Sequence, residues 1–368
     1  MTHSKTPLTL SDGRQLIYFD HAPGRVPVSD TRGLHASTHR GEIRYDALVG
    51  EWVTVAGHRQ ERTFLPQADS CPLCPSSDTN QTEIPDSAYE VVIFDNRFPS
   101  LTPPDNGWTP PSTDYLLTSD NAGHCEVVCF TDNHDATFAD LPRSRVELVI
   151  QAWKDRTAEL IAKDYVDYVF VFENFGKEIG VTISHPHGQI YAYPFIPSRA
   201  KRHLDQVALH KEVTGRHLID DLVAREVSEG VRLVDQGEHW VAFVPFAARW
   251  PIQVQLHPRA PVHDFTELTD AQAVELADIY PRLLKRFQGL FDQQVPYIAA
   301  WNQAPNGPAR EHGRLFLDLF TTRRDTNKLK YLAGSESAMG AFVNDISPEK
   351  AAEMLRASRL PVAEGGMS

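Results

Sequence analysis

Length, composition and charge set the first limits on this chain. It has 368 residues, 41% of them hydrophobic and 23% charged, which is a globular composition long enough for more than one domain. A formal net charge of −13 argues against nonspecific binding to nucleic acid or to anionic membranes. The apolar runs are too short to span a membrane, and residues 1–10 lack the apolar core of a signal peptide, so we expect a cytoplasmic protein.

The predicted secondary structure repeats in two series. Each runs from a strand through a short apolar turn and an amphipathic helix to a second strand and a His-Gly dipeptide. The first series has its landmarks at 124–130, Phe138, 143–163, 165–174 and His187. The second has them at 252–256, Phe265, 270–287, 297–302 and His312. The same order at nearly constant offsets predicts a duplicated α+β unit.

Segments outside the two series receive simpler predictions. We expect one helix at about 201–227 to link the copies, with an apolar stripe on one side. Residues 1–35 and 359–368 are rich in Gly, Pro and polar residues, and we expect them to be peripheral.

The segment 185–189, which reads His-Pro-His-Gly-Gln, carries the strongest chemical signal. Side chains two residues apart on an extended chain point the same way, so His185 can orient the site while His187 reacts. A neutral imidazole attacks phosphorus readily and forms a phosphoramidate that a later nucleophile can open. For an isolated His-x-His pattern, a pair of structural or surface histidines is the alternative.

Cys71 and Cys74 give the second chemical signal. Two thiolates at this spacing suit tetrahedral zinc, and a Cys-x2-Cys pair inside a cell suggests metal or redox chemistry. The alternative is a loop with two free thiols, turned by its prolines. We interpret Cys125 and Cys129 as buried small apolar residues.

These motifs resemble the galactose-1-phosphate uridylyltransferase family, the branch of the histidine-triad superfamily whose third triad position is Gln. Other segments match the family in order: 44–53, Arg59 and Arg62, 71–74, 94–101, 171–174, 238–251 and 330–336. The resemblance covers about 40–358. It implies an α+β fold of duplicated histidine-triad-like units, with an antiparallel, half-barrel-like sheet and packed helices. We expect a catalytic unit at 1–197 and a degenerate unit at 198–368 that supplies sugar-phosphate or dimer contacts.

The resemblance implies a double displacement between UDP-glucose and galactose 1-phosphate. His187 would attack the α-phosphorus, expel glucose 1-phosphate and hold UMP until galactose 1-phosphate takes it. Attack through one ring nitrogen needs the proton on the other, so we expect a backbone carbonyl near His185 to fix it. Gln189 would donate to a nonbridging phosphate oxygen, because an amide has no proton to give as an acid.

The resemblance also assigns binding residues. Nucleotide and phosphate contacts fall to Arg59, Arg62, Asn96, Asn174 and Thr182, the last standing where the family usually has Ser. Hexose-phosphate contacts fall to Lys330, Tyr331 and Glu336, with help from the neighbouring subunit of a homodimer. Ser335 and Phe342 depart from the family's usual Tyr and Gln, which leaves the sugar contacts less defined.

Metal ligands follow from the same resemblance. Structural zinc would be held by Cys71, Cys74, His134 and His185. A second metal, usually iron, is common in the family, but its positions here read His203, Asn302, Phe316 and Asp318, so we expect that site to be absent.

Two other functions remain open on the sequence. One is a nucleoside-diphosphate-sugar phosphorylase or adenylyltransferase, which passes the nucleotide to inorganic phosphate. The other is a zinc-containing nucleotide-binding module without turnover.

Overall fold

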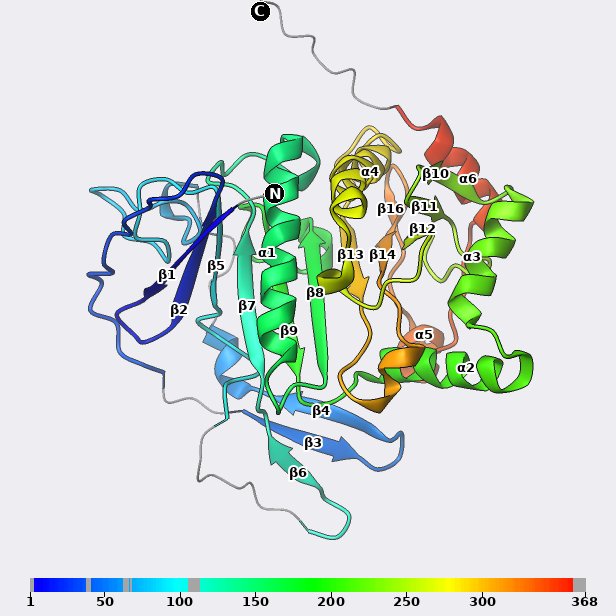
Figure 1. Ribbon diagram of the computed structural model, residues 1–368, viewed down its shortest axis with the longest axis horizontal. Helices are drawn as coiled ribbons and strands as arrows, with labels where there is room; N and C mark the ends of the chain where they lie inside the picture. Colours follow the sequence, from blue (N-terminus) through cyan, green and yellow to red (C-terminus); the bar gives the residue numbers. More distant parts are fainter. Residues whose placement is uncertain (1–2, 38–40, 62–65, 67, 105–112, 360–368) are drawn as a thin grey trace, which may run out of the picture.

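The computed structural model describes residues 3–37, 41–61, 66, 68–104 and 113–359. Within these residues, an eleven-stranded antiparallel sheet runs through both halves of the chain in the order β1-β2-β5-β7-β9-β8-β13-β14-β12-β11-β10 (Figure 1). In chain order these strands are β1 (Ser4–Thr9), β2 (Gln15–Asp20), β5 (Val91–Asp95), β7 (His124–Cys129), β8 (Tyr168–Phe175), β9 (His187–Tyr193), β10 (Leu233–Gln236), β11 (Trp240–Phe243), β12 (Ile252–Pro258), β13 (Tyr297–Asn302) and β14 (Phe316–Thr321).

The remaining elements surround this sheet. The smaller sheets consist of β3 (Glu42–Asp46), β4 (Glu51–Val55) and β6 (Thr118–Asp120), and of β15 (Arg323–Asp325) with β16 (Lys328–Leu329). The helices are α1 (Arg143–Ile161), α2 (Ser198–Thr214), α3 (Leu218–Glu229), α4 (Asp270–Gln288), α5 (Gly334–Met339) and α6 (Pro348–Ala357). In the part of the chain that is described, every helix is too short or too polar to cross a membrane.

The strand order confirms the predicted duplication. The first copy contributes β7, β9 and β8 in that order, and the second contributes β13, β14 and β12, which mirrors it. The copies meet where β8 pairs with β13, so one sheet is continuous across both. The α+β fold with an antiparallel sheet and packed helices is therefore as the sequence predicted.

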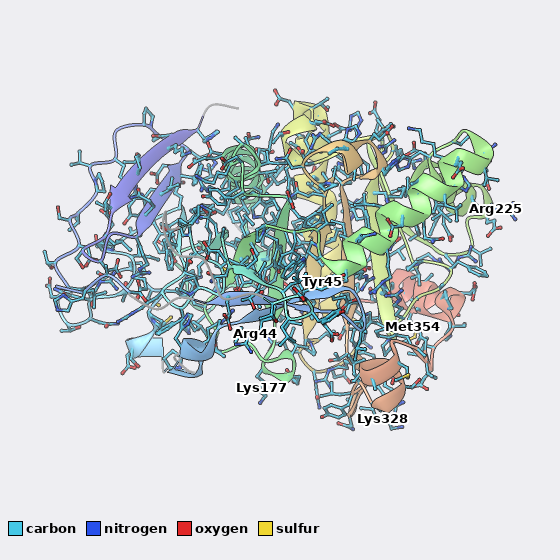
Figure 2. The ribbon with its side chains drawn as sticks, turned by 90° about the horizontal axis from the view of Figure 1, so that it is seen from below. Arg44, Tyr45, Lys177, Arg225, Lys328 and Met354 are labelled. Carbon is cyan, nitrogen blue, oxygen red and sulfur yellow. The ribbon has the colours of Figure 1, made fainter. Side chains whose placement is uncertain are left out.

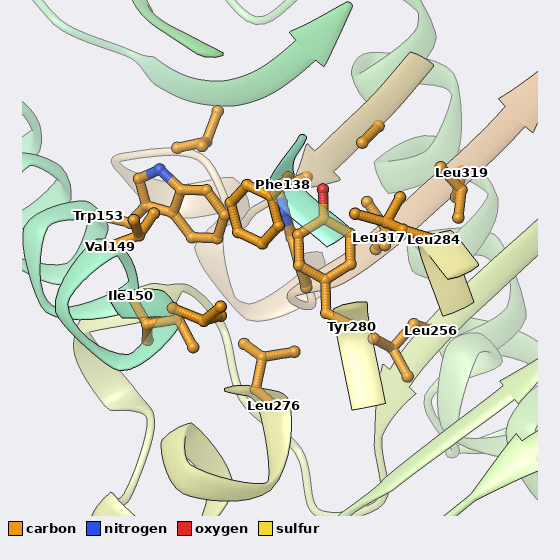
Figure 3. Close-up of a cluster of buried hydrophobic side chains, with 14 of the residues drawn as sticks. Phe138, Val149, Ile150, Trp153, Leu256, Leu276, Tyr280, Leu284, Leu317 and Leu319 are labelled. Atoms are coloured by element: carbon orange, nitrogen blue, oxygen red, sulfur yellow. The ribbon is translucent and has the colours of Figure 1, made fainter. Parts of the chain in front are cut away.

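Helices α1 and α4 cover one face of the sheet and pack against each other (Figure 1). Between them Phe138, Trp153 and Tyr280 form an aromatic core, in which the ring centroids of Phe138 and Tyr280 are 4.8 Å apart (Figure 3). Helix α4 begins where Thr269 and Gln272 cap each other's backbone N–H groups, which defines where the helix enters the core. This packing leaves the opposite face of the sheet for the site.

Strand β9 shows how the two faces divide. Ile190 and Ala192 are buried in the helix-covered core. Side chains alternate between the two faces along a strand, so His187 and Gln189 point to the opposite face. Cross-strand pairing extends that face sideways in one row, which consists of Val127, Gln189, Phe172, Ala300, Asp318 and Gln255.

Two predictions about the flanking segments are wrong. Residues 4–20 are not peripheral, because β1 and β2 add two strands to the main sheet and Tyr18 and Phe19 are fully buried. The expected linking helix is two helices, α2 and α3. Gly215 ends α2 in the left-handed conformation, with φ of 73°, which glycine adopts without strain.

Glu173 in β8 is a buried carboxyl on the helix-covered face. It accepts hydrogen bonds from the hydroxyls of Tyr297 at 2.9 Å and Tyr280 at 3.4 Å, and burial raises its pKa to about 8. The folded protein thus holds this proton above pH 4.5, the ordinary pKa of the group. Stability from this group is therefore complete below about pH 4.5 and is lost as the pH rises toward 8.

Glu173→Gln is expected to remove this pH dependence, because a neutral amide has no proton to lose. Between pH 4.5 and about 8, the unmodified protein should lose on the order of 4 kcal/mol of unfolding free energy that Glu173→Gln does not lose. Denaturant unfolding at several pH values measures it, with Glu353→Gln on the exposed side of α6 as a control. Parallel pH profiles for Glu173→Gln and the unmodified protein would show that this carboxyl does not titrate differently on folding.

Candidate active site and metal cluster

His187 begins β9, and its imidazole is fixed by the residue two positions earlier. His187 Nδ1 lies 2.7 Å from the carbonyl oxygen of His185, and a carbonyl only accepts, so the ring proton is on Nδ1. Burial lowers the pKa of His187, which keeps the ring neutral near pH 7. The lone pair of Nε2 is then free. The expected backbone carbonyl near His185 is confirmed.

Gly188 lets the strand continue beside this histidine. A Cβ at this position would lie 2.7 Å from the Phe130 ring and 3.0 Å from the carbonyl oxygen of Phe172. Only glycine therefore allows β9 to pack tightly between β7 and β8 at this point. The next residue, Gln189, returns to the same face as His187 and is partly exposed there.

Cys71, Cys74, His134 and His185 come together although more than a hundred residues separate the first from the last. Their candidate ligand atoms all lie within 4.8 Å of one another. Cys74 Sγ is 3.4 Å from His134 Nδ1 and 3.5 Å from His185 Nδ1. Two sulfurs and two nitrogens make a donor set that could hold a metal ion in a closed tetrahedral shell.

The charges in this cluster also suit a cation. Burial and then the neighbouring Cys71 raise the pKa of Cys74 to about 12, so this thiol needs a bound cation to ionise near pH 7. Burial lowers the pKa of His185 to about 4, so its imidazole is neutral and can act as a ligand. The donor chemistry therefore fits a metal.

Tyr89 and Thr131, which no sequence motif indicates, orient His185 through its Nε2 atom. Its Nε2 lies 2.8 Å from both the Thr131 carbonyl oxygen and the Tyr89 hydroxyl, while that hydroxyl donates to the carbonyl of Leu73 at 2.9 Å. The proton therefore resides on Nε2 and Nδ1 faces the cysteines. One ring thus connects the cluster to the strand that carries His187. A backbone carbonyl and a tyrosine with no motif around it leave no recognisable signal in a sequence.

The residues expected to bind nucleotide and phosphate lie around β9 and the end of β5. Arg59, on the short 3-10 helix Gly57–Glu61, approaches the Tyr191 hydroxyl at 3.5 Å, and Tyr191 shares the face of Gln189. Asn96 lies in the wall of a cavity of about 1000 Å³. Asn174 follows Phe172 on the same face of β8, toward the His187 end of β9. Thr182 is partly exposed just before the motif, and Arg62 lies outside the described residues.

The residues expected to bind hexose phosphate lie elsewhere. Lys330 Nζ pairs with Glu336 Oε1 at 2.9 Å and also contacts the Val343 carbonyl, and both charged side chains are largely buried. Tyr331 is 78% exposed. Across the described residues, this segment has no hydrogen bond, ion pair or ring contact with β9.

At the positions that correspond to the family's second metal, the residues do not fit a metal ion. Asp318 Oδ2 is bound by Arg199 at 2.8 Å and its Oδ1 by Gln253 at 2.7 Å. His203 faces the ring of Phe316, with centroids 6.1 Å apart. A guanidinium and a phenyl ring at this place disfavour a cation, so the absence of iron stays a prediction that these contacts support.

A further polar cluster, also missed from the sequence, consists of Asp95, His124 and Glu126 on the helix-covered face. Arg156 already pairs with Glu126 through both carboxylate oxygens. This guanidinium supplies the compensating charge and would repel a metal ion, so we interpret the cluster as structural.

Comparison with known proteins identifies the family of this chain. Residues 33–197 match the family model described as galactose-1-phosphate uridyl transferase, N-terminal domain, and residues 201–364 match the C-terminal domain. Galactose-1-phosphate uridylyltransferase of Streptomyces lividans is 42% identical over 363 residues, covering 96% of this chain and 97% of the relative. That of Thermotoga maritima is 35% identical over 325 residues, covering 87% and 99%. A solved uridylyltransferase structure, 32% identical, gives a TM-score of 0.77 over 86% of this chain and 98% of its own. The chain belongs to the galactose-1-phosphate uridylyltransferase family.

Proposed function

We propose that this protein transfers UMP between UDP-glucose and galactose 1-phosphate through a uridylyl-histidine. The observation that carries the proposal is the 2.7 Å hydrogen bond from His187 Nδ1 to the His185 carbonyl. It leaves Nε2 as an unprotonated nucleophile at the start of β9. Relatives named for this activity over nearly their whole length support the same substrates.

In the first step, His187 Nε2 forms a bond to the α-phosphorus of UDP-glucose, and the bond from phosphorus to the oxygen of glucose 1-phosphate breaks. In the second step, a phosphate oxygen of galactose 1-phosphate attacks the same phosphorus, the P–N bond breaks, and UDP-galactose leaves. Gln189 donates hydrogen bonds to a nonbridging oxygen in both transition states. A sugar phosphate leaves without being protonated, so the reaction needs no general acid. The amide of Gln189 therefore suffices at this position.

The remaining assignments follow the same proposal. Arg59, Arg62, Asn96, Asn174 and Thr182 bind the nucleotide and its phosphates. Lys330, Tyr331 and Glu336 serve the site of the other subunit in a homodimer, since within one chain they are not joined to β9. Residues 1–197 form the catalytic unit and residues 198–368 the degenerate one, in a cytoplasmic enzyme.

Zinc is the metal that we propose for Cys71, Cys74, His134 and His185. When bound, it would keep both thiolates ionised and hold His185 in place. His185 in turn holds the carbonyl that orients His187, so the metal acts through the strand and has no contact with substrate in this scheme.

An intact-mass measurement after incubation with UDP-glucose alone tests the function. We expect the mass to increase by one uridylyl group, and galactose 1-phosphate should then remove it and yield UDP-galactose. A second incubation supplies inorganic phosphate as the sole acceptor. A nucleoside-diphosphate-sugar phosphorylase would then convert UDP-glucose to UDP and glucose 1-phosphate, which distinguishes it from a uridylyltransferase. Absence of an adduct, with transfer still occurring, would exclude the covalent mechanism.

Gln189→Ala is expected to slow transfer by roughly two to three powers of ten, the usual effect of losing one transition-state donor. Gln255→Ala is a matched control, because Gln255 lies in the same row of the same face but four strands away. Single-turnover formation of the adduct measures the chemical step, and thermal unfolding checks that both variants fold. Equal rate constants for Gln189→Ala and the unmodified enzyme would remove Gln189 from the mechanism.

A further inference from the structure

Tyr89 joins the two parts of the metal cluster. The cysteines of the cluster belong to the loop 71–74, whereas His185 belongs to the segment that leads into β9. The Tyr89 hydroxyl lies 2.9 Å from the carbonyl oxygen of Leu73, within the loop, and 2.8 Å from His185 Nε2. A carbonyl only accepts, so the hydroxyl proton goes to Leu73 and the hydroxyl oxygen accepts from His185 Nε2–H. One side chain thus holds both parts of the ligand set.

The position of Tyr89 is itself fixed by the core. The residue lies two positions before β5 and is 2% exposed. It packs with Cys71, Leu73 and Cys129 in one buried cluster. A ring packed on this many sides has little freedom to follow a movement of the loop or of His185. Its hydroxyl therefore defines how far apart the loop and the imidazole lie.

Two other carbonyls of the loop are also hydrogen-bonded, but their donors act on the loop alone. Thr82 Oγ1 donates to the Cys74 carbonyl at 2.6 Å, and the backbone N–H of Glu83 donates to that of Pro72 at 3.0 Å. Among the residues that the structure describes, neither donor is hydrogen-bonded to His185. These two contacts fix the shape of the loop, whereas Tyr89 fixes its distance from the histidine.

The hydroxyl bridge is relevant to a metal because it does not depend on one. The candidate ligand atoms of the cluster already lie within 4.8 Å of one another. An ion that meets assembled donors does not have to order them first, so less of its binding free energy is lost to conformational entropy. Groups that hold a metal-binding histidine through its other ring nitrogen typically change metal affinity by about ten- to a hundredfold. We expect an effect of this size from the hydroxyl of Tyr89.

We propose that Tyr89 is a positioning residue that sets the metal affinity of the cluster. It holds the loop and His185 at the separation that suits a shared ion, and it acts on His187 only through the cluster. A tyrosine hydroxyl serves His185 here as a carboxylate often serves a zinc-binding histidine. The inference rests on the metal and the activity proposed above, but its first measurement needs neither substrate nor turnover.

The experiment measures the zinc affinity of the full chain by competition with a chromophoric chelator, after the metal has been removed under reducing conditions. Tyr89→Phe keeps the ring and removes only the hydroxyl. Tyr168→Phe is the matched control, because Tyr168 is similarly buried, its hydroxyl accepts the backbone N–H of Gln303 at 3.2 Å, and it pairs with Tyr193 at the far end of β9. Tyr45→Phe, on β3 of the small sheet, controls for a tyrosine outside the main sheet (Figure 2).

Tyr89→Phe should bind zinc about ten- to a hundredfold more weakly than the unmodified protein, while both tyrosine controls bind it normally. Thr82→Val removes a hydroxyl that is bound to the same loop but not to His185, so its effect should be smaller. If the metal-free Tyr89→Phe does not fold, the rate at which excess chelator removes zinc from the loaded protein gives the same comparison. Unchanged zinc affinity in Tyr89→Phe, or equal weakening in Tyr89→Phe and either Thr82→Val or Tyr168→Phe, would overturn the proposal.

Formation of the uridylyl adduct gives a second readout. With limiting zinc, Tyr89→Phe should form the adduct more slowly than the unmodified enzyme. Excess zinc should restore the rate constant, because mass action fills the weakened site and the ion then holds the two parts together. A rate constant that stays low at every zinc concentration would contradict a role through the cluster alone. If neither protein formed an adduct while their zinc affinities differed as expected, the positioning role would stand and the proposed function would fail.

Discussion

His187→Ala is expected to abolish UDP-galactose formation together with the uridylyl adduct. The substitution removes the atom that forms the bond to phosphorus. The loss should therefore exceed that of Gln189→Ala by several powers of ten, since covalent catalysis is removed along with its transition state. Steady-state transfer and intact mass, measured on the same samples, report both effects.

His312→Ala is the matched control for this result. His312 belongs to the His-Gly dipeptide that corresponds to His187-Gly188 in the second copy, but it precedes β14 and has no part in the proposed chemistry. It should form the adduct at the normal rate. Ping-pong turnover above a trace in His187→Ala would assign the nucleophile to another residue.

His187→Gly extends the test from loss to recovery. If only the nucleophile is missing, the glycine variant should regain transfer when UMP is supplied as an imidazole-linked uridylate, which brings the leaving imidazole with it. Recovery in His187→Gly, together with no recovery in the double variant that also carries Gln189→Ala, would separate the role of His187 as nucleophile from that of Gln189 as hydrogen-bond donor.

The sequence predicted the chemistry of this site better than its surroundings. Cys71, Cys74, His134 and His185 meet as the family resemblance implied, and the Cys-x2-Cys spacing by itself already suggested a metal. The carbonyl of His185 was also expected, since a neutral nucleophilic imidazole needs one acceptor. Tyr89 was not, because one buried tyrosine among several differs from the others only through a contact made after folding.

The errors in the fold have equally specific causes. The composition of residues 1–35 as a whole is polar, and this average hides the apolar run 16–19 that becomes the buried β2. The expected linking helix runs through Gly215, although a glycine between two amphipathic stretches is a usual helix end. The environment of Asp318 depended on Arg199 and Gln253, which are far from it in sequence.

Cys74→Ser is expected to remove the metal and much of the thermal stability. Two sulfurs and two nitrogens complete a closed shell, so elemental analysis of the unmodified protein should find about one zinc per chain and essentially no iron. Serine does not ionise near neutral pH and binds zinc weakly, and metal binding contributes folding free energy directly. The variant should lose zinc to a chelator at much lower concentration and unfold at a lower temperature.

Cys125→Ser is the matched control, because Cys125 is a buried free cysteine that contacts Ser100, at 3.4 Å, and lies outside the cluster. It should keep its zinc. In Cys74→Ser, the fraction that remains folded should still form some uridylyl adduct, since a metal in the cluster would act on His187 only through His185 and its carbonyl. If that folded fraction kept full activity without metal, the link from cluster to nucleophile would be unnecessary. If stoichiometric iron were found, the contacts of Asp318 with Arg199 and of His203 with Phe316 would have to rearrange to admit it, since a phenyl ring and an occupied carboxylate leave too few donors.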